Sequence, residues 1–173
     1  MARTGRWLLL FALAILSATP IWAQGIEGKT APDFTLKDID GDRISLADLT
    51  KDGPVLLDFW ATWCVPCKQA MPKLAEIHED FEGDGFQLVA ISIDNTRSLN
   101  KVKPYVRSQG YKFPVLLDTD SQVLRKYRGT SVPHTVLVTQ EGTIAKVWIG
   151  YHPGEEKEIR AEITALLEGG AGD

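Results

Sequence analysis

The feature that most constrains the fold of this chain is a pair of cysteines placed where a buried strand gives way to a helix. The run Val55–Trp60 is apolar apart from Asp58, which predicts a strand buried on both faces of a sheet. Cys64 and Cys67 follow, three residues apart, in the first turn of a helix predicted over residues 65–82. Two cysteines at that spacing can form a disulfide without any movement of the backbone.

Short apolar runs alternate with helical patterns from Gly28 to about Leu167, without a low-complexity linker or an internal repeat. This alternation is typical of a single α/β domain, in which helices pack on the faces of a sheet. The pattern also predicts strands at residues 86–93 and 115–117, helices at 98–109, 121–127 and 155–167, and hairpins over 33–46 and 135–149. The expected fold class is therefore α/β.

Composition and charge exclude several classes of protein. The chain has 173 residues, of which 44% are hydrophobic and 24% are charged, as expected for one compact domain. Its 19 basic and 23 acidic residues give a net charge of -4, so it has no basic field that would attract nucleic acid. The two cysteines are too few for a disulfide-stapled miniprotein or a four-cysteine zinc site.

Residues 1–23 have the order of a secretory signal peptide. Two arginines precede the apolar run Trp7–Leu16, and small and polar residues follow it up to Ala23. The run is shorter than the roughly 20 residues that a spanning helix needs. We expect cleavage after Ala23, which leaves residues 24–173 as the exported domain. A retained membrane anchor is the alternative, because Ile21 stands where a smaller residue is usual; in both cases the domain lies outside the cytoplasm.

The position of the cysteine pair predicts dithiol chemistry. Unpaired N–H groups and the helix dipole at a helix N-terminus favour an anion, so Cys64 is expected to be the thiolate nucleophile. Cys67, one turn inside the helix, can attack a mixed disulfide at Cys64 and release the partner. A permanent structural disulfide and a metal site, which would need ligands from His78, His134 and His152, are the alternatives. Redox chemistry is the preferred interpretation, with no cofactor or metal beyond the cysteine pair itself.

Three segments carry a resemblance to a known family. The segment Trp63–Cys67 after its apolar strand resembles the thioredoxin superfamily; Gly28–Leu36 and Phe113–Asp118 narrow this to the exported TlpA/ResA-like thiol-disulfide oxidoreductases, over residues 26–168. The resemblance implies a thioredoxin-like fold, a central mixed sheet flanked by helices, with an N-terminal hairpin and a central insertion. It also implies a periplasmic or membrane-facing role. Reduction of disulfides in apocytochrome c or another exported protein, with electrons from a membrane donor protein, is often part of that role.

The resemblance also implies a substrate-binding surface. The family has a cis-proline loop facing the cysteines, which maps onto Val132 and Pro133 and would expose the backbone of Val132 for strand-like pairing with a substrate peptide. Trp63 is expected to offer the partner an apolar platform, and Pro66 matches thioredoxin-like reductants. His134 is interpreted either as a residue that tunes substrate contact or as a solvated loop histidine.

Asp58 is the expected proton acceptor. An acid inside a buried strand is costly, and desolvation should raise its pKa. In thioredoxins the acid at this place assists deprotonation of the second cysteine, and the resemblance assigns that role here. Many ResA-like proteins instead have asparagine there and a glutamate three residues after the second cysteine, where this chain has Ala70. We infer that Asp58 carries the base function; the alternative is a structural carboxylate paired with a buried lysine or water.

The leading functional hypothesis is an extracytoplasmic reductant of protein disulfides. An oxidant that introduces disulfides is a rival, because the spacing of the cysteines does not determine the direction of electron flow. A thiol peroxidase is suggested by Ala31–Leu36, which peroxiredoxins also show, but such enzymes need a peroxidatic cysteine beside a threonine and an arginine. The last rival is a non-catalytic module that binds peptides in the cis-proline groove.

Overall fold

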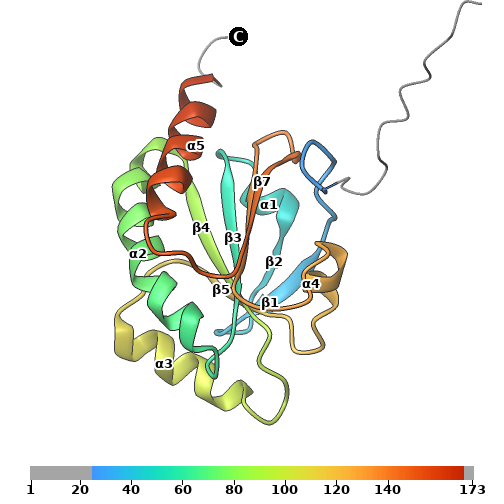
Figure 1. Ribbon diagram of the computed structural model, residues 1–173. Coiled ribbons are helices and arrows are strands. Elements are labelled where there is room, and N and C mark those ends of the chain that lie inside the picture. Colours follow the sequence, from blue (N-terminus) through green and yellow to red (C-terminus); the bar gives the residue numbers. More distant parts are fainter. Residues whose placement is uncertain (1–24, 170–173) are drawn as a thin grey trace, which may run out of the picture.

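The computed structural model describes residues 25–169, which form a seven-stranded mixed sheet with helices on both faces (Figure 1). The strand order is β2-β1-β5-β4-β3-β6-β7. The predicted export segment, residues 1–23, lies outside the described residues.

The sheet combines a parallel centre with antiparallel edges. The strands are β1 (Thr35–Asp38), β2 (Arg43–Ser45), β3 (Val55–Trp60), β4 (Gln87–Ser92), β5 (Val115–Leu117), β6 (His134–Val138) and β7 (Ile144–Ile149). Strand β4 pairs in parallel with β3 and β5, while the pairs β1–β2, β1–β5, β3–β6 and β6–β7 are antiparallel. The mixed sheet and the N-terminal hairpin expected from the resemblance are confirmed.

Strand β3 lies between β4 and β6, and all of its side chains are buried. Side chains alternate along a strand, so Leu57 and Phe59 enter the core on one face of the sheet, and Leu56 and Trp60 enter the core on the other. Asp58 points to the same face as Leu56 and Trp60. This double burial explains why the β3 sequence is almost continuously apolar.

The helices divide between these two faces (Figure 1). They are α1 (Leu46–Leu49), α2 (Val65–Phe81), α3 (Val102–Gln109), α4 (Gln122–Lys126) and α5 (Glu156–Gly169), with 3-10 turns η2 (Glu82–Asp84) and η3 (Leu99–Lys101). Buried residues of α2, α3 and α5 pack on the face that carries Trp60, whereas those of α1 and α4 pack on the face that carries Phe59.

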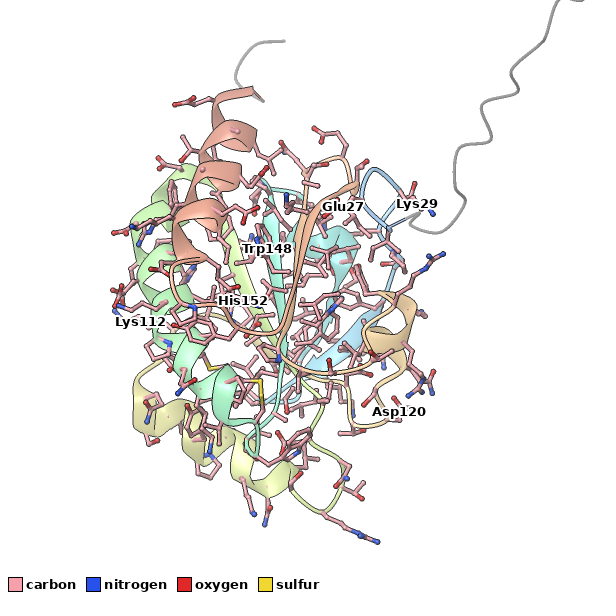
Figure 2. All side chains as sticks on the ribbon, in the orientation of Figure 1. Glu27, Lys29, Lys112, Asp120, Trp148 and His152 are labelled. Carbon is pink, nitrogen blue, oxygen red and sulfur yellow. A yellow bond between two sulfur atoms is a disulfide. The ribbon has the colours of Figure 1, made fainter. Side chains whose placement is uncertain are left out.

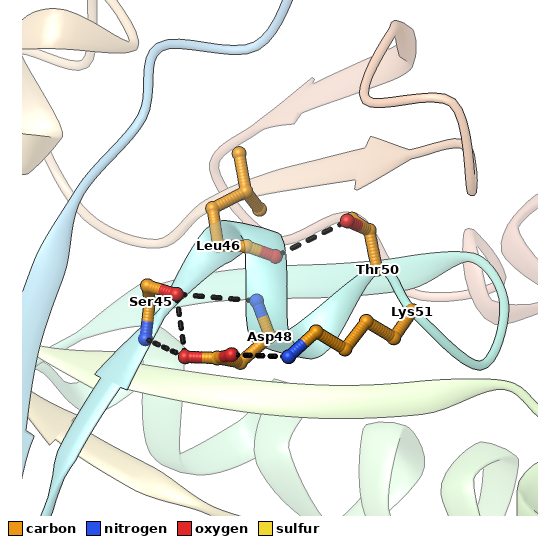
Figure 3. A network of polar contacts seen from close by, with 5 residues as sticks. All are labelled: Ser45, Leu46, Asp48, Thr50 and Lys51. Carbon is orange, nitrogen blue, oxygen red and sulfur yellow. Dashed lines mark hydrogen bonds and ion pairs between the residues drawn. The ribbon is translucent and has the colours of Figure 1, made fainter.

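Two helices differ from the sequence prediction. The helix predicted over 98–109 starts as the 3-10 turn η3 and becomes α-helical only at Val102. Pro104 explains the difference, because a proline lacks an N–H and is tolerated in the first turn of an α-helix but not deeper. The sequence analysis missed α1, which begins at Leu46. Its N-cap, Ser45, forms a capping box: the Ser45 hydroxyl accepts from the Asp48 N–H at 3.1 Å, and the Asp48 carboxylate accepts from the Ser45 N–H (Figure 3).

We predict that Gly85→Ala destabilises the protein more than Gly110→Ala. Both glycines have positive φ, +89° and +72°, so alanine at either position is strained. A Cβ at Gly85 would also lie 2.6 Å from the carbonyl oxygen of Asp52, whereas a Cβ at Gly110 would have no neighbour within 4 Å. We expect a loss of unfolding free energy of about 1 kcal/mol for Gly110→Ala and about 3 kcal/mol for Gly85→Ala. Urea denaturation of both variants measures the loss of unfolding free energy. Equal losses would contradict the close approach of residue 85 to the Asp52 carbonyl oxygen.

Candidate active site

The two cysteines lie at the start of α2, where they form a disulfide (Figure 2). Cys64 is the N-cap residue of the helix, and its Sγ accepts from the backbone N–H of Cys67 at 3.2 Å. Pro66, in the first turn, needs no hydrogen-bond partner for its nitrogen. The sulfur of Cys64 therefore lies where a helix N-terminus stabilises negative charge, as the sequence predicts.

The surroundings of the disulfide are apolar and unevenly exposed. Cys67 is fully buried and Cys64 almost so, while their neighbours Trp63 and Val65 are 61% and 65% exposed. Pro66 is exposed as well. A partner that approaches Cys64 therefore meets an apolar surface before it meets the sulfur.

The loop before β6 lies against Cys64. The Val132–Pro133 peptide bond is cis, as expected, and the carbonyl oxygen of Val132 lies 3.7 Å from the Sγ of Cys64. Val132 is partly exposed, and Pro133 is buried. At the same end of the sheet Ile149, the last residue of β7, is 63% exposed. Trp63, Val65 and Ile149 are the exposed large hydrophobic residues of the described part of the chain.

Asp58 is fully buried in β3, on the face covered by α2 and α5. Its Oδ1 accepts a hydrogen bond from the Thr135 hydroxyl at 3.1 Å, and its Oδ2 has no protein partner. Burial raises the pKa of Asp58 to about 7, the Thr135 hydrogen bond opposes this rise, and the charge of Glu155 adds to it. The side chain shares its face with Trp60, which belongs to the same apolar cluster as Cys67.

No lysine of the described residues pairs with Asp58. The residue of β4 that pairs with Asp58 is Ala90, and no positive charge contributes to the raised pKa of Asp58. Of the alternative, a structural carboxylate paired with a buried lysine or water, the pairing with a lysine is therefore wrong. A buried carboxyl group without a cation is neutral over a wide pH range, and it can take up or release a proton near neutral pH.

The sequence analysis did not identify two residues around Asp58. Thr135 lies directly opposite Asp58 in the β3–β6 register. Glu155 lies just before α5, and its charge contributes to the raised pKa of Asp58. The hairpin prediction placed Thr135 in a strand, but only the pairing of β6 with β3 shows which residue it faces.

A second buried acid holds the loop between β3 and α2. The carboxylate of Asp94 accepts from the backbone N–H of Thr62 at 2.7 Å and from its hydroxyl at 2.6 Å. The Ser92 hydroxyl donates to the same carboxylate at 2.9 Å. With these hydrogen bonds, Asp94 fixes the backbone two residues before Cys64. The sequence analysis missed this residue as well.

Of the three histidines, His152 contacts a residue of this arrangement: its Nδ1 lies 3.5 Å from the Oε2 of Glu155. His134 is not a solvated loop residue: it is buried as the first residue of β6, with Nε2 3.2 Å from the Tyr127 carbonyl oxygen, and burial lowers its pKa. Its ring packs near Phe59, on the sheet face opposite Asp58. His78 lies on α2 beside Glu82, and His152 lies before α5. Residues 25–169 contain no cluster of three or more His, Cys, Asp or Glu side chains suited to a metal ion.

None of the helices within residues 25–169 has the length and apolar character needed to cross a membrane.

Known proteins are similar to this chain in sequence and in fold. ResA, a thiol-disulfide oxidoreductase of Bacillus subtilis, is 42% identical over 124 residues, which span 72% of this chain and 68% of the relative. The ResA protein of Geobacillus thermodenitrificans is 35% identical over 123 residues, 71% of this chain and 69% of the relative. A crystal structure from Chlorobium tepidum, assigned to a thiol:disulfide interchange protein DsbE, has a TM-score of 0.75 at 30% identity and covers 82% of this chain and 97% of its own.

The AhpC/TSA family model matches residues 27–147, a segment that includes both cysteines, Asp58 and Pro133. With this match, the ResA relatives and the disulfide at the N-terminus of α2, the chain belongs to the AhpC/TSA family of the thioredoxin superfamily and is a thiol-disulfide oxidoreductase.

Proposed function

We propose that this protein is an exported dithiol reductant that reduces disulfides in other exported proteins. The observation that carries the proposal is the Cys64–Cys67 pair at the N-terminus of α2, with the Val132 carbonyl at 3.7 Å from the first sulfur. This arrangement supports attack by Cys64 on a disulfide in a polypeptide that lies along Val132.

The first step joins the protein to its substrate. The Cys64 thiolate attacks one sulfur of the substrate disulfide, the substrate S–S bond breaks, and its second sulfur leaves as a thiolate that takes a proton from water. The helix N-terminus and the Cys67 N–H stabilise the attacking thiolate. The product of this step is a mixed disulfide through Cys64.

The second step releases the substrate. Cys67 gives its proton to the carboxylate of Asp58, and its sulfur attacks the Sγ of Cys64. The bond between Cys64 and the substrate breaks, and the substrate leaves with both sulfurs reduced. The two electrons come from the cysteine pair, which returns to the disulfide seen here. With a pKa of about 7, Asp58 is a strong enough base for this transfer and is still partly ionised at neutral pH.

The surface around Cys64 fits an extended polypeptide. The position of Val132 beside Cys64 supports strand-like pairing of its backbone with a substrate peptide. Trp63 and Pro66 flank the sulfur on the α2 side, and Ile149 is exposed at the same end of the sheet. The apolar character of this rim favours apolar side chains next to the substrate cysteine.

The location and partners follow from the sequence. The signal-like order of residues 1–23 supports export, with cleavage after Ala23 or retention as an anchor. An exported reductant needs electrons from the cytoplasm, so a membrane protein that relays them is the expected donor. Apocytochrome c is a candidate substrate, since its haem-binding cysteines must be reduced before haem attaches. The redox-active cysteine pair is the only cofactor that this chemistry requires.

The direction of electron flow is tested by the reduction potential of the Cys64–Cys67 couple. For a reductant we expect a value near that of thioredoxin, about −270 mV. The measurement equilibrates the protein in graded glutathione or dithiothreitol buffers and traps the free thiols. A value nearer about −120 mV would make the protein an oxidant of folding proteins.

Cys67→Ser should accumulate mixed disulfides through Cys64. The variant keeps the nucleophile but loses the thiol that releases the substrate, so adducts with exported proteins should appear on non-reducing gels. Cys64→Ser is the matched control and should form none. Equal adduct yields from the two variants would contradict the assignment of Cys64 as the nucleophile.

Asp58→Asn should slow the release step. The amide cannot accept a proton from Cys67, and general-base catalysis contributes about 10²-fold or more, so we expect a loss of about that size near neutral pH. The rate is measured as decay of a preformed mixed disulfide. An unchanged rate would remove Asp58 from the mechanism.

The stability of the same variant shows whether it still folds and whether the pKa of Asp58 is raised. The pKa of Asp58 rises from 3.8 to about 7 on folding, so the folded state holds this proton at a pH where the unfolded chain has lost it. The contribution of the protonated Asp58 to the free energy of unfolding is therefore fully present below about pH 4. It falls by up to about 4 kcal/mol as the pH rises to about 7. Asp58→Asn should lose this dependence and be more stable than the wild type above about pH 7. The unfolding free energies of the wild type and of Asp58→Asn are measured by urea denaturation at acidic and at alkaline pH. A difference between the two proteins that is the same at both pH values would contradict the raised pKa.

A further inference from the structure

The segment between β4 and β5 concentrates positive charge. Residues 95–112 contain five basic residues and no acidic one, and residues 59–75 around the cysteines contain two basic residues and no acidic one. The whole chain has a net charge of -4, so its acidic excess lies outside these two segments. The structure brings the two segments together at the end of the sheet where α2 begins (Figure 1).

The loop after β4 lies against the loop that leads into α2. The Ile93 N–H donates to the Trp60 carbonyl oxygen at 2.9 Å. The Asp94 carboxylate accepts from the Thr62 N–H at 2.7 Å. Arg97, three residues further along the chain, is exposed. These hydrogen bonds place the turn that carries Arg97 next to the loop that leads to the cysteines.

Helix α3 adds two lysines to the same end of the molecule. The centre of the Tyr105 ring lies 5.4 Å from that of Trp60 in β3. The Nζ of Lys68, the residue after Cys67, lies 5.5 Å from the centre of the Tyr105 ring. Lys101 comes directly before α3 and about one helical turn before Tyr105, so it lies on the same side of α3 as this ring. Lys68 and Lys101 therefore lie on the same flank of the cysteine pair.

Three exposed cations form what we call the basic flank: Lys68, Arg97 and Lys101. None of the three has an ion pair with an acid of residues 25–169. The other two cations of α3 differ, because Lys103 and Arg107 lie 2.7 Å and 3.9 Å from Oδ1 of Asp40. Like charges without a counter-charge repel one another and do not stabilise a fold. A partner of opposite charge gives the basic flank a use that the fold does not.

We propose that the basic flank is a docking surface for acidic side chains of the polypeptide whose disulfide Cys64 attacks. This inference rests on the proposed function, because it needs a protein substrate at Cys64. A positive surface beside the reacting sulfur attracts a negative segment and orients it before the reaction. The basic flank lies on the β4 side of β3, and the loop with Val132 lies on the β6 side. The substrate is then held on both sides of Cys64.

A protein partner fits the basic flank better than a lipid surface does. The flank shares its end of the molecule with Cys64 and with the exposed residues Trp63 and Val65. A flat anionic membrane seated on the flank would cover the sulfur on which the reaction depends. An acidic segment of a substrate, by contrast, brings the target disulfide to that sulfur.

The test uses peptides with one cysteine joined by a disulfide to nitrothiobenzoate, flanked by aspartates, asparagines or lysines. When the Cys64 thiolate attacks the peptide sulfur, the S–S bond breaks and coloured nitrothiobenzoate leaves. Each rate is divided by the rate of the same peptide with dithiothreitol, which corrects for the peptide's own reactivity. At low ionic strength we expect the reduced wild type to prefer the aspartate peptide to the asparagine peptide about tenfold. The preference should vanish at about 1 M salt, where the Debye length is about 3 Å.

Lys101→Glu reverses one charge of the basic flank and should remove most of the preference for the aspartate peptide. Lys112→Glu is the matched control, because Lys112 belongs to the same segment, is exposed and has no ion pair within residues 25–169. The neighbouring Phe113 ring lies 5.9 Å from the ring of His78, which is about three turns of α2 beyond Cys67. Lys112→Glu should therefore keep the wild-type preference. Both variants should reduce hydroxyethyl disulfide, an uncharged probe, at the wild-type rate.

The possible outcomes separate the docking surface from the proposed function. Equal corrected rates of the wild type with all three peptides, or a preference that Lys112→Glu removes as fully as Lys101→Glu does, would overturn the docking surface and leave the dithiol mechanism intact. A wild type that reacts neither with the peptides nor with hydroxyethyl disulfide would overturn both. Sedimentation with phosphatidylglycerol vesicles that Lys101→Glu abolishes, without any peptide preference, would assign the flank to a lipid surface and overturn the proposal.

Discussion

The pairing of β3 with β6 is the constraint on which the site depends. With Phe59 opposite His134 and Asp58 opposite Thr135, the loop that precedes β6 reaches the N-terminus of α2, and the Val132 carbonyl lies beside Cys64. A slip of one residue would send every β6 side chain to the other face of the sheet. Thr135 would then no longer reach Asp58. Because both strands are buried on both faces, the hydrophobic pattern makes such a slip costly.

The electrostatics of the site depend on a buried acid, Asp58, whose pKa is not lowered by any positive charge within residues 25–169. Asp58 is buried, one of its oxygens has a neutral hydroxyl as donor, and the charge that contributes to its raised pKa is that of another carboxyl group, Glu155. Each of these features except the hydroxyl favours the protonated form. The stabilising contribution of the protonated Asp58 is lost as the pH rises from about 4 to about 7, and this raised pKa is what suits Asp58 to the role of proton acceptor that we propose for it.

The site combines a rigid interior with an apolar rim. Asp94 fixes the loop before Cys64 through the backbone and hydroxyl of Thr62, and β6 fixes the loop on the other side of the sulfur. The exposed residues Trp63 and Ile149 lie around this framework. For the substrate binding that we propose, ordered backbone next to Cys64 lowers the entropy lost when a substrate strand binds, and the apolar side chains supply area for contact.

The sequence by itself determined the α/β class, the central strand Val55–Trp60, the helix after it and the chemistry of the cysteine pair. These are local properties: a period of apolar residues, and two thiols at the spacing of one helical turn. It also singled out Asp58, since an acid in an apolar run is conspicuous. Only the tertiary structure decided which groups surround that acid: Ala90 and Thr135 through strand register, and Glu155 from about a hundred residues further along the chain. Such contacts depend on how the elements pack, and no local pattern in a single sequence contains that information.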